Sequence, residues 1–401
     1  ELSGPGAVTV TAGDPQPPAD SDGDGIPDSE DNCPNEWGPA SNGGCPETGG
    51  DPGYSYKDGV GPRDISCNGV TLDPGDNIES ASNSNSNDTT FCLNPGTYYN
   101  QSVTPKDGQK FIGLNGATLD GNHSTTYAFS GGANNIHIEN LIIKNYEPPD
   151  QMGAIKGGDH GVSQGTYGWQ IIRNEIAYNR AGGIRTGHEM LIQGNAIHHN
   201  EQIGIAGSGD DMIVEGNEIA YNNYLERYDW GWEAGGTKFV RTNRLIVRNN
   251  ESHHNTGPGL WTDISNINTL YENNTVHDNI DGPGIFHEIS YAATIRDNHI
   301  YNNGYPDSDP NNIYWTRSGI QISASKDVEV YNNLLENNSK GITGVDQCRG
   351  DGDFGPYSLT NVNVYNNTII DSRLSRAGTD CNSYIDMEYY NNTWLGNSRL
   401  E

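Results

Sequence analysis

The chain has 401 residues and a formal net charge of -31; only 32% of its residues are hydrophobic, while Gly occupies 52 positions. A conventional layered core is hard to build from so little apolar material. The acidic balance argues against nucleic acid as a partner, because phosphate binding requires clustered cations. No apolar run of about 18 residues occurs, so we expect neither a membrane-spanning helix nor a membrane partner.

The N-terminal region divides into a tether and a predicted calcium site. Residues 1–19 are rich in Pro, Gly and Ala, which indicates a flexible tether. A twelve-residue loop then places oxygen ligands at positions 1, 3, 5, 9 and 12, with Gly at position 6 and a main-chain carbonyl at position 7. This spacing suits calcium, which takes about six to eight oxygen ligands. The predicted ligands are Asp20, Asp22, Asp24, Ile26, Asp28 and Asp31.

The loop continues into Asn32-Cys33-Pro34, and the segment resembles a thrombospondin type 3 repeat over about 15 residues. The resemblance implies structural calcium bound within residues 20–50, as in other extracellular proteins with this element. An EF-hand is disfavoured, because position 12 is Asp rather than Glu and no helical pattern flanks the loop. We expect residues 51–401 to form a separate domain.

Six cysteines fall into three pairs that are close in sequence. An even number without a CxxC motif favours disulfides over a zinc site, although six cysteines allow fifteen pairings and buried free thiols are the alternative. Disulfides imply an oxidising compartment, so we expect a secreted or cell-surface protein. The expected pairs are Cys33 with Cys45, Cys67 with Cys92, and Cys348 with Cys381.

From about residue 60 onward the sequence is periodic. Short apolar runs end in an Asn every 21 to 25 residues, with some repeats lengthened by about ten, and a second Asn follows five positions later. Such a repeat holds three short strands, and stacked repeats predict an all-β, right-handed parallel β-helix. Asn tolerates left-handed backbone at turns, and its amide can bond to the equivalent Asn of the next coil. We expect this solenoid to be a monomer.

A third ladder consists of Gly followed by an apolar residue, and two acids stand four residues after its glycines in adjacent coils. These acids are Asp263 and Glu288. If the apolar residue points inward, alternation sends both acids outward, one strand spacing apart. Carboxyl groups about 5 Å apart are typical of retaining glycoside hydrolases. Like charges at that distance raise one pKa, so we predict a nucleophile and an acid/base residue.

Aromatic and polar residues accompany the acids. Trp261 and Phe286 are expected to point outward and to offer apolar faces to a sugar ring. An insertion with Trp230 and Trp232 is expected to form a wall of the groove. The other predicted substrate-binding residues are Lys238, Trp315, Arg317 and Gln321.

The coil before Asp263 carries a further candidate catalytic acid, Glu233. Gly235 and Gly259 both precede their next ladder Asn by 15 residues, so we align them with each other. This alignment predicts that Glu233, Thr237 and Phe239 point outward. It also places Lys238 inward, an unusual position for a cation unless a buried acid or a bulge accommodates it.

The segments GPGLWTD (257–263) and GPGIFHEIS (282–290) resemble the core of β-helix glycoside hydrolases. The resemblance is strongest to the family containing β-xylosidases, looser to the one containing fucosidases and xylanases, and covers about residues 90–345. It implies that Asp263 is the nucleophile and Glu288 the acid/base residue of an enzyme acting on a polysaccharide or oligosaccharide. The long sandwich insertion of the β-xylosidase family is missing, so the substrate is not implied.

Three alternatives remain. A polysaccharide lyase or uronate epimerase needs Lys, Arg or calcium to neutralise a uronate carboxylate; the candidates Lys238, Arg185 and Arg317 are few beside the acids. A non-catalytic adhesin or filament subunit would need only the calcium segment and the disulfides. The two acids could also be solvated, or bind a second calcium ion. Irregular coils near 145–170, 222–245, 303–318 and 343–360 favour a binding face.

Overall fold

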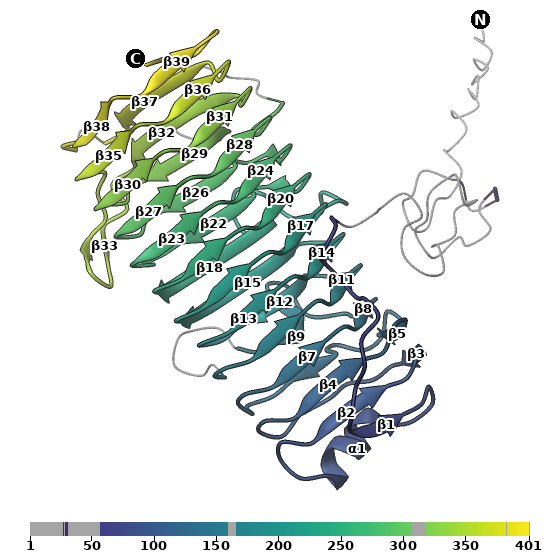
Figure 1. The fold of residues 1–401 in the computed structure, drawn as a ribbon. Helices are drawn as coiled ribbons and strands as arrows, with labels where there is room; N and C mark the ends of the chain where they lie inside the picture. Colours follow the sequence, from purple (N-terminus) through teal and green to yellow (C-terminus); the bar gives the residue numbers. More distant parts are fainter. Residues whose placement is uncertain are drawn as a thin grey trace, which may run out of the picture. The chain divides into compact units, whose positions relative to one another are not determined.

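The computed structural model describes residue 27 and residues 29–30, 57–158, 166–306, 317–381 and 383–400. It divides into two compact units, Glu1–Tyr56 and Lys57–Glu401. The second unit is a stack of coils whose strands form three long sheets of 13, 12 and 11 strands (Figure 1). Neighbouring coils pair in parallel, so the predicted parallel β-helix is confirmed. The predicted calcium ligands and the Cys33 and Cys45 pair lie outside the described residues.

The first two sheets, here called sheets A and B, contain mostly strands of three or four residues. Sheet A consists of β1 (Val70–Leu72), β2 (Thr90–Leu93), β4 (Lys110–Gly113), β7 (His137–Glu139), β10 (Gln170–Ile172), β13 (Leu191–Gln193), β16 (Ile213–Glu215), β19 (Ile246–Arg248), β23 (Thr269–Glu272), β27 (Ala293–Arg296), β30 (Val328–Tyr331), β35 (Val362–Tyr365) and β38 (Met387–Tyr390). Sheet B consists of β3 (Gly96–Tyr99), β5 (Ala117–Asp120), β8 (Ile142–Lys144), β11 (Glu175–Ala177), β14 (Ala196–His198), β17 (Glu218–Ala220), β20 (Glu251–His253), β24 (Thr275–His277), β28 (His299–Tyr301), β31 (Leu334–Glu336), β36 (Thr368–Ile370) and β39 (Thr393–Leu395).

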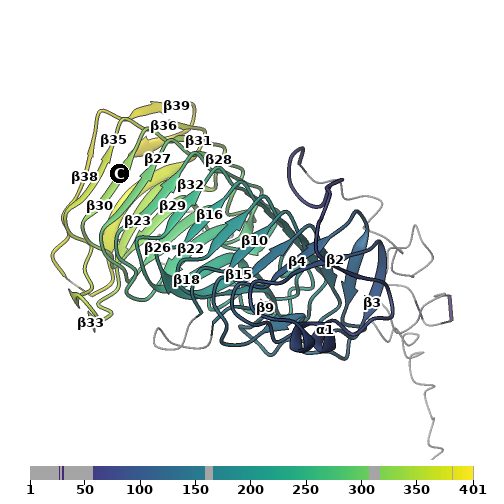
Figure 2. The ribbon, with the colours of Figure 1, turned by 60° about the horizontal axis from the view of Figure 1, so that its bottom comes forward.

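The third sheet, sheet C, contains the longest strands and the most irregular connections. It consists of β6 (Phe129–Ser130), β9 (Gly153–Lys156), β12 (Gly182–Thr186), β15 (Ile203–Asp210), β18 (Gly235–Asn243), β22 (Leu260–Asp263), β26 (Ile285–Glu288), β29 (Ser318–Ser323), β32 (Lys340–Asp346), β37 (Leu374–Thr379) and β40 (Arg399–Leu400). Two small pairs complete the strands, β21 (Thr256–Gly257) with β25 (Ile280–Asp281) and β33 (Asp351–Gly352) with β34 (Gly355–Pro356). Figure 2 shows the coils lying one behind another and the β33 hairpin projecting from them.

One short helix, α1 (Ile78–Ser84), lies beside β1 and β2 at the N-terminal end of the stack (Figure 1). The side chain of Asn77 caps it by accepting a bond from the Ser80 amide. Ile78 is fully buried, so the helix adds an apolar residue at this end of the core.

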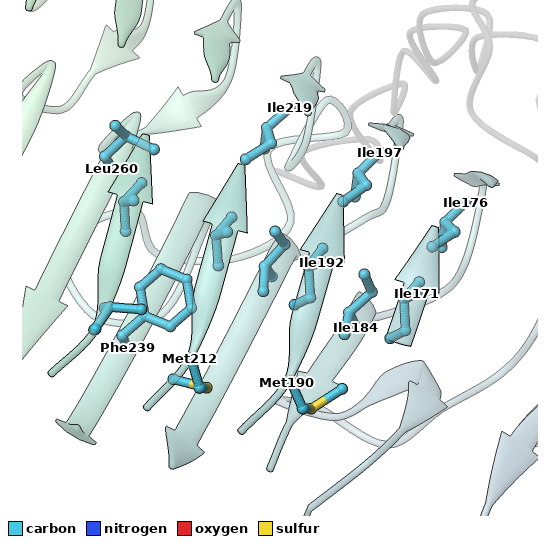
Figure 3. Packing of buried hydrophobic residues seen from close by; sticks show 14 of the residues in the cluster. Ile171, Ile176, Ile184, Met190, Ile192, Ile197, Met212, Ile219, Phe239 and Leu260 are labelled. Carbon is cyan, nitrogen blue, oxygen red and sulfur yellow. The ribbon is translucent and has the colours of Figure 1, made fainter. Parts of the chain in front are cut away.

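The interior is a narrow apolar column in which like residues stack coil on coil. Ile171 and Ile192 of sheet A, Ile176 and Ile197 of sheet B, and Ile184 of sheet C are at most 1% exposed and point toward one another (Figure 3). Because each coil contributes only a few such side chains, the fold needs little apolar sequence, which explains the low hydrophobic content.

Both predicted Asn ladders are present at the turns that flank sheet B. In the first ladder the Asn250 amide donates to Asn274 Oδ1 (3.1 Å) and to the carbonyl of Val214 (2.9 Å). In the second ladder the Asn255 amide donates to Asn279 Oδ1 (2.9 Å). The left-handed backbone was expected at the ladder Asn but lies one residue earlier in most coils. The Asn ladders therefore serve hydrogen bonding between coils, and the preceding residue makes the turn.

The register of β18 differs from the sequence alignment by one residue. Thr237 pairs with Ile205, and Phe239 pairs with Thr262, so Gly236 rather than Gly235 is the ladder glycine. A one-residue shift sends every side chain of a strand to the other face. Thr237 and Phe239 are therefore buried inside, and Lys238 points outward, which reverses the prediction for all three.

Two predicted disulfides are present, Cys67–Cys92 and Cys348–Cys381. Disulfides are typical of proteins that fold in an oxidising compartment. Within the part of the chain that the structure describes, no helix is long and apolar enough to span a membrane.

Candidate functional site

On the outer face of sheet C, equivalent positions of successive coils hold different residue types, whereas the interior stacks like residues. Two neighbouring rows of outward residues run across β15, β18, β22, β26 and β29. The first row reads Ala206, Lys238, Trp261, Phe286 and Gln321, and the second reads Val240, Asp263, Glu288 and Ser323. Thr262 of β22 pairs with His287 of β26. Asp263 and Glu288 are the next residues of these two strands, so the two acids lie on adjacent rungs.

A cavity of about 370 Å³ opens over these rows, but Phe286, Gln321 and Ser323 do not line it. Seven charged residues line it, namely Arg185, Glu233, Lys238, Arg241, Asp263, Glu288 and Arg349. The chain as a whole has 53 acidic and 22 basic residues, yet four of these seven are basic. With four cations against three acids, the cavity lining has a net charge of +1 within a strongly acidic protein.

Asp263 is held by Lys238 on the preceding rung. Lys238 Nζ lies 2.9 Å from Asp263 Oδ2, and both side chains are about nine-tenths buried. The same ammonium group donates to the main-chain carbonyl of Trp232 and lies 3.9 Å from the centre of the Trp261 ring. The outward position of Lys238 thus gives the cation three partners that an interior position would not offer.

Glu288 is held by a cation from outside the sheet. Arg349 Nη1 donates to Glu288 Oε1 at 3.0 Å from the loop after β32. Burial and the neighbouring charge of Asp263 raise the pKa of Glu288 to about 7, although Arg349 and Lys238 oppose this shift. A carboxyl group with this pKa can exchange a proton near neutral pH, as an acid or base catalyst must.

Trp261 is not available as a stacking platform for a sugar. One face of its indole lies against Lys238, and the Phe286 ring is stacked with it at a centroid distance of 5.4 Å. Only 1% of the residue is exposed. The expected outward direction is correct, but Trp261 serves to support Lys238 rather than to present an open face.

Two of the remaining predicted residues line the cavity. They are Glu233 and Trp232, and Trp232 is 68% exposed. Burial raises the pKa of Glu233 above its usual value, although the charges of Lys238 and Arg185 oppose this shift. Trp230 and Arg317 do not line the cavity: Arg317 lies over the Trp230 ring at 5.7 Å and pairs with Asp281 at 2.6 Å. Gln321, on the same outward row, is buried. Trp315 lies outside the described residues.

Arg349 was missed by the sequence analysis, as were the lining residues Arg241 and Gln151. The adjacent Cys348–Cys381 disulfide anchors the Arg349 loop beside sheet C. The hairpin of β33 and β34 then folds back over earlier coils, where Tyr357 Oη bonds to Ser265 Oγ at 2.6 Å. The irregular spacing near 343–360 and the neighbouring cysteine were the available signals.

Several buried polar atoms on the outer face of sheet C have no hydrogen-bond partner among the described residues. They include Ser208 Oγ, Trp261 Nε1, Asp263 Oδ1 and Gln321 Oε1. Buried polar groups are normally paired, so atoms of this kind suit a hydrogen-bonding ligand. A second calcium site between Asp263 and Glu288 is disfavoured, because Lys238 and Arg349 already neutralise these carboxylates.

Residues 160–308 match the family model described as right handed beta helix region. The A-module of mannuronan C-5 epimerase AlgE4 from Azotobacter vinelandii is similar in structure, with a TM-score of 0.62 and 16% identity over 80% of this chain and 91% of that one. A mannuronic acid specific polysaccharide family 6 lyase from human gut microbiota has a TM-score of 0.52 and 12% identity over 83% of this chain and 82% of that one. No curated protein matches the sequence.

At these identities the similarity establishes the fold. The parallel β-helix is right-handed, as predicted from the ladders. The structures named above are an epimerase and a lyase, so the resemblance to glycoside hydrolases is supported for the fold only.

Proposed function

We propose that the protein is a secreted enzyme that acts on a uronate polysaccharide such as mannuronan, as a lyase or a C-5 epimerase. Both reactions begin by removing the proton at C5, next to the uronate carboxylate. This proposal replaces glycoside hydrolysis as the preferred function. The similar folds of a mannuronan epimerase and a mannuronate lyase support it, as does the chemistry of the cavity.

The cation content of the cavity is the observation that carries the proposal. Four of its sixteen lining residues are Lys or Arg, whereas the chain contains 22 in 401 residues. A neutral sugar does not require this concentration of positive charge. A polyuronate does, because its carboxylates must leave water and the negative charge that develops during proton removal must be stabilised.

We assign the first step to Glu288 and Arg349. The carboxylate and the proton to be removed are attached to the same sugar carbon, so the base and the neutralising cation must lie close together. Arg349 contacts Glu288 directly, and more than a third of its side chain is exposed. Deprotonated Glu288 takes the C5 proton, and the electron pair moves into the carboxylate, which Arg349 stabilises.

The second step decides between the two reactions. In a lyase, the electron pair forms a double bond between C4 and C5, the C4–O bond breaks, and the leaving oxygen takes the proton that Glu288 removed. In an epimerase, water gives a proton to C5 from the opposite face, and Glu288 releases the removed proton to solvent. The Lys238–Asp263 pair is proposed to position the sugar, with Arg185 binding a further carboxylate.

Retaining glycoside hydrolysis remains a second candidate because Asp263 and Glu288 lie on adjacent rungs. The two candidates predict opposite pH profiles. A base must be deprotonated, so lyase or epimerase activity should rise as the pH passes through about 7. Glu288 acting as the general acid of a hydrolase would have to be protonated, so hydrolysis should fall over the same range.

The test is to incubate the protein with mannuronan and with neutral xylan. We expect a rise in absorbance near 235 nm for a lyase, or a changed C5 configuration by proton NMR for an epimerase, with mannuronan only. Glu288→Gln and Arg349→Ala should abolish the signal. Glu215→Gln is the matched control, since Glu215 pairs with Arg248 on sheet A outside the cavity. Reducing ends released from xylan without a 235 nm signal would instead support the hydrolase.

A further inference from the structure

A cluster of His and acidic side chains lies on the outer surface where sheet B meets the following turn. His253 and His277 are paired outward residues of β20 and β24. His254 and Asp278 follow them, each with left-handed backbone, at equivalent positions of adjacent coils. One potential ligand atom from each of His254, His277 and Asp278 lies within 4.8 Å of the other two.

Two rows of stacked rings fix this cluster in place. In one row His254 stacks on Tyr221, with 4.9 Å between ring centroids. In the other, His277 is stacked between His253 and Tyr301, at 4.9 and 4.5 Å. The next rung of the first row holds Asp278 in place of an aromatic ring, so a carboxylate lies where the stack ends. The ligand atoms are therefore positioned by packed neighbours, as a preformed site requires.

The hydrogen bonding of His277 calls for a positive charge at this point. Its Nε2 lies 3.2 Å from Glu251 Oε1, and its Nδ1 lies 2.7 Å from Asp278 Oδ2. A neutral imidazole has one N–H and can donate to only one of these carboxylates. If the N–H points to Glu251, the Nδ1 lone pair and the carboxylate face each other. A second proton on Nδ1 removes this repulsion, and so does a metal ion that both atoms coordinate after moving slightly apart.

The partners of the cluster resemble the outer shell of a metal site. Glu251 accepts from His277 and is itself held by Lys57 Nζ at 2.9 Å. His253 likewise contacts Glu218 Oε1 at 3.2 Å. A carboxylate on the far nitrogen orients a metal-binding His and raises its basicity. His277 is buried, whereas His254 and Asp278 are partly exposed, so one side of the cluster stays open to solvent.

We infer that His254, His277 and Asp278 form a site for a zinc ion, distinct from the cavity over sheet C and from the predicted calcium loop. Two imidazoles and one carboxylate are ligands that zinc accepts, and water would complete the coordination. Calcium is a poor fit, because it prefers oxygen ligands. Unlike the proposed function, this inference does not depend on the substrate of the cavity.

The test is calorimetric titration of the tag-free full chain, first treated with a chelator, with zinc chloride in excess calcium. We expect one saturable zinc site per chain. His254→Gln and Asp278→Asn should each weaken zinc affinity at least about tenfold while circular dichroism stays unchanged. His199→Gln is the control, because His199 occupies the same turn position two coils earlier and stacks on Tyr221.

Two results would overturn the inference. One is the absence of saturable zinc binding by the parent protein, which would mean that a second proton on His277 supplies the positive charge. The other is zinc binding that both variants retain at the affinity of the parent, which would place the ion elsewhere on the chain.

Discussion

The inner turns and the outer face of sheet C belong to the same coils but are built in opposite ways. Along the turns, Asn follows Asn at equivalent positions, and each amide bonds to the next coil. Along the outer face, Lys238, Trp261 and Phe286 succeed one another at a single position. Repetition satisfies the backbone and holds the stack together, whereas variation creates a particular arrangement of charges. Residues that stabilise the stack and residues proposed for catalysis therefore lie on different faces, so substitutions on one face should leave the property of the other unchanged.

The largest effect is expected from Glu288→Gln on the outer face. The amide keeps the size of the side chain but cannot accept a proton, so turnover of mannuronan should fall by about 10²–10⁴-fold. Unfolding by urea should remain cooperative with a midpoint no lower than that of the parent. A variant that keeps more than a tenth of the parent rate would contradict the role of Glu288 as the base.

The converse change is Asn250→Ala in the first ladder. The Asn250 side chain donates two hydrogen bonds and accepts two more from Asn217, all in a buried turn. Its loss leaves buried donors and acceptors unpaired, so the free energy of unfolding should fall by about 2–4 kcal/mol. Activity at a temperature where the variant is folded should stay within about twofold. A larger loss of activity would show that the two faces are coupled.

The dependence of stability on pH sharpens the comparison. Burial and Asp263 raise the pKa of Glu288 from 4.5 to about 7, so the folded protein binds this proton more tightly than the unfolded chain. The ionised side chain therefore destabilises the fold progressively as pH rises from about 4.5 to about 7. Glu288→Gln removes this penalty, and its stability relative to the parent should increase across that window by up to about 3 kcal/mol.

Urea unfolding of both proteins between pH 4.5 and 8 measures this difference. A constant difference across the window would mean that Glu288 titrates normally. Asn250→Ala serves as the control, because no ionisable group is removed and its difference from the parent should not change with pH.

The smallest effect is expected from the two disulfides. Replacing Cys348 and Cys381 by Ser releases the loop that brings Arg349 to Glu288, so KM for mannuronan should rise about tenfold. Replacing Cys67 and Cys92 by Ser should leave KM unchanged, because that bond lies in the first coils. Initial rates at several substrate concentrations distinguish the two. Equal KM values would show that the disulfide does not position Arg349.

The sequence predicted the solenoid because its signal repeats. Each ladder Asn bonds to the Asn at the equivalent position of the next coil, so the first ladder repeats the same turn signal ten times. The outer face has no such redundancy. Gly204, Gly236 and Gly259 precede their ladder Asn by 13, 14 and 15 residues, so an alignment at constant distance chose Gly235 and turned Lys238 inward. The bulge that absorbs this difference lies between β15 and β18.

The positions of Asp263 and Glu288 followed from alternation, but their partners did not. Lys238 contacts Asp263 only in the observed register of β18, which differs by one residue from the sequence alignment. Arg349 comes from a loop 61 residues after Glu288. Without these cations the acids suggested a pair suited to neutral sugars. With them, the same acids belong to a cavity lined by four cations, which changed the preferred substrate class.

The most direct test of the central claim is oligosaccharide binding to the Glu288→Gln variant, measured by calorimetry. A mannuronate hexamer should bind, a neutral xylose hexamer should not, and adding Arg349→Ala should weaken binding of the mannuronate at least about tenfold. Raised salt should weaken binding further, since the attraction is electrostatic. Equal binding of both hexamers, unaffected by Arg349→Ala, would contradict the account.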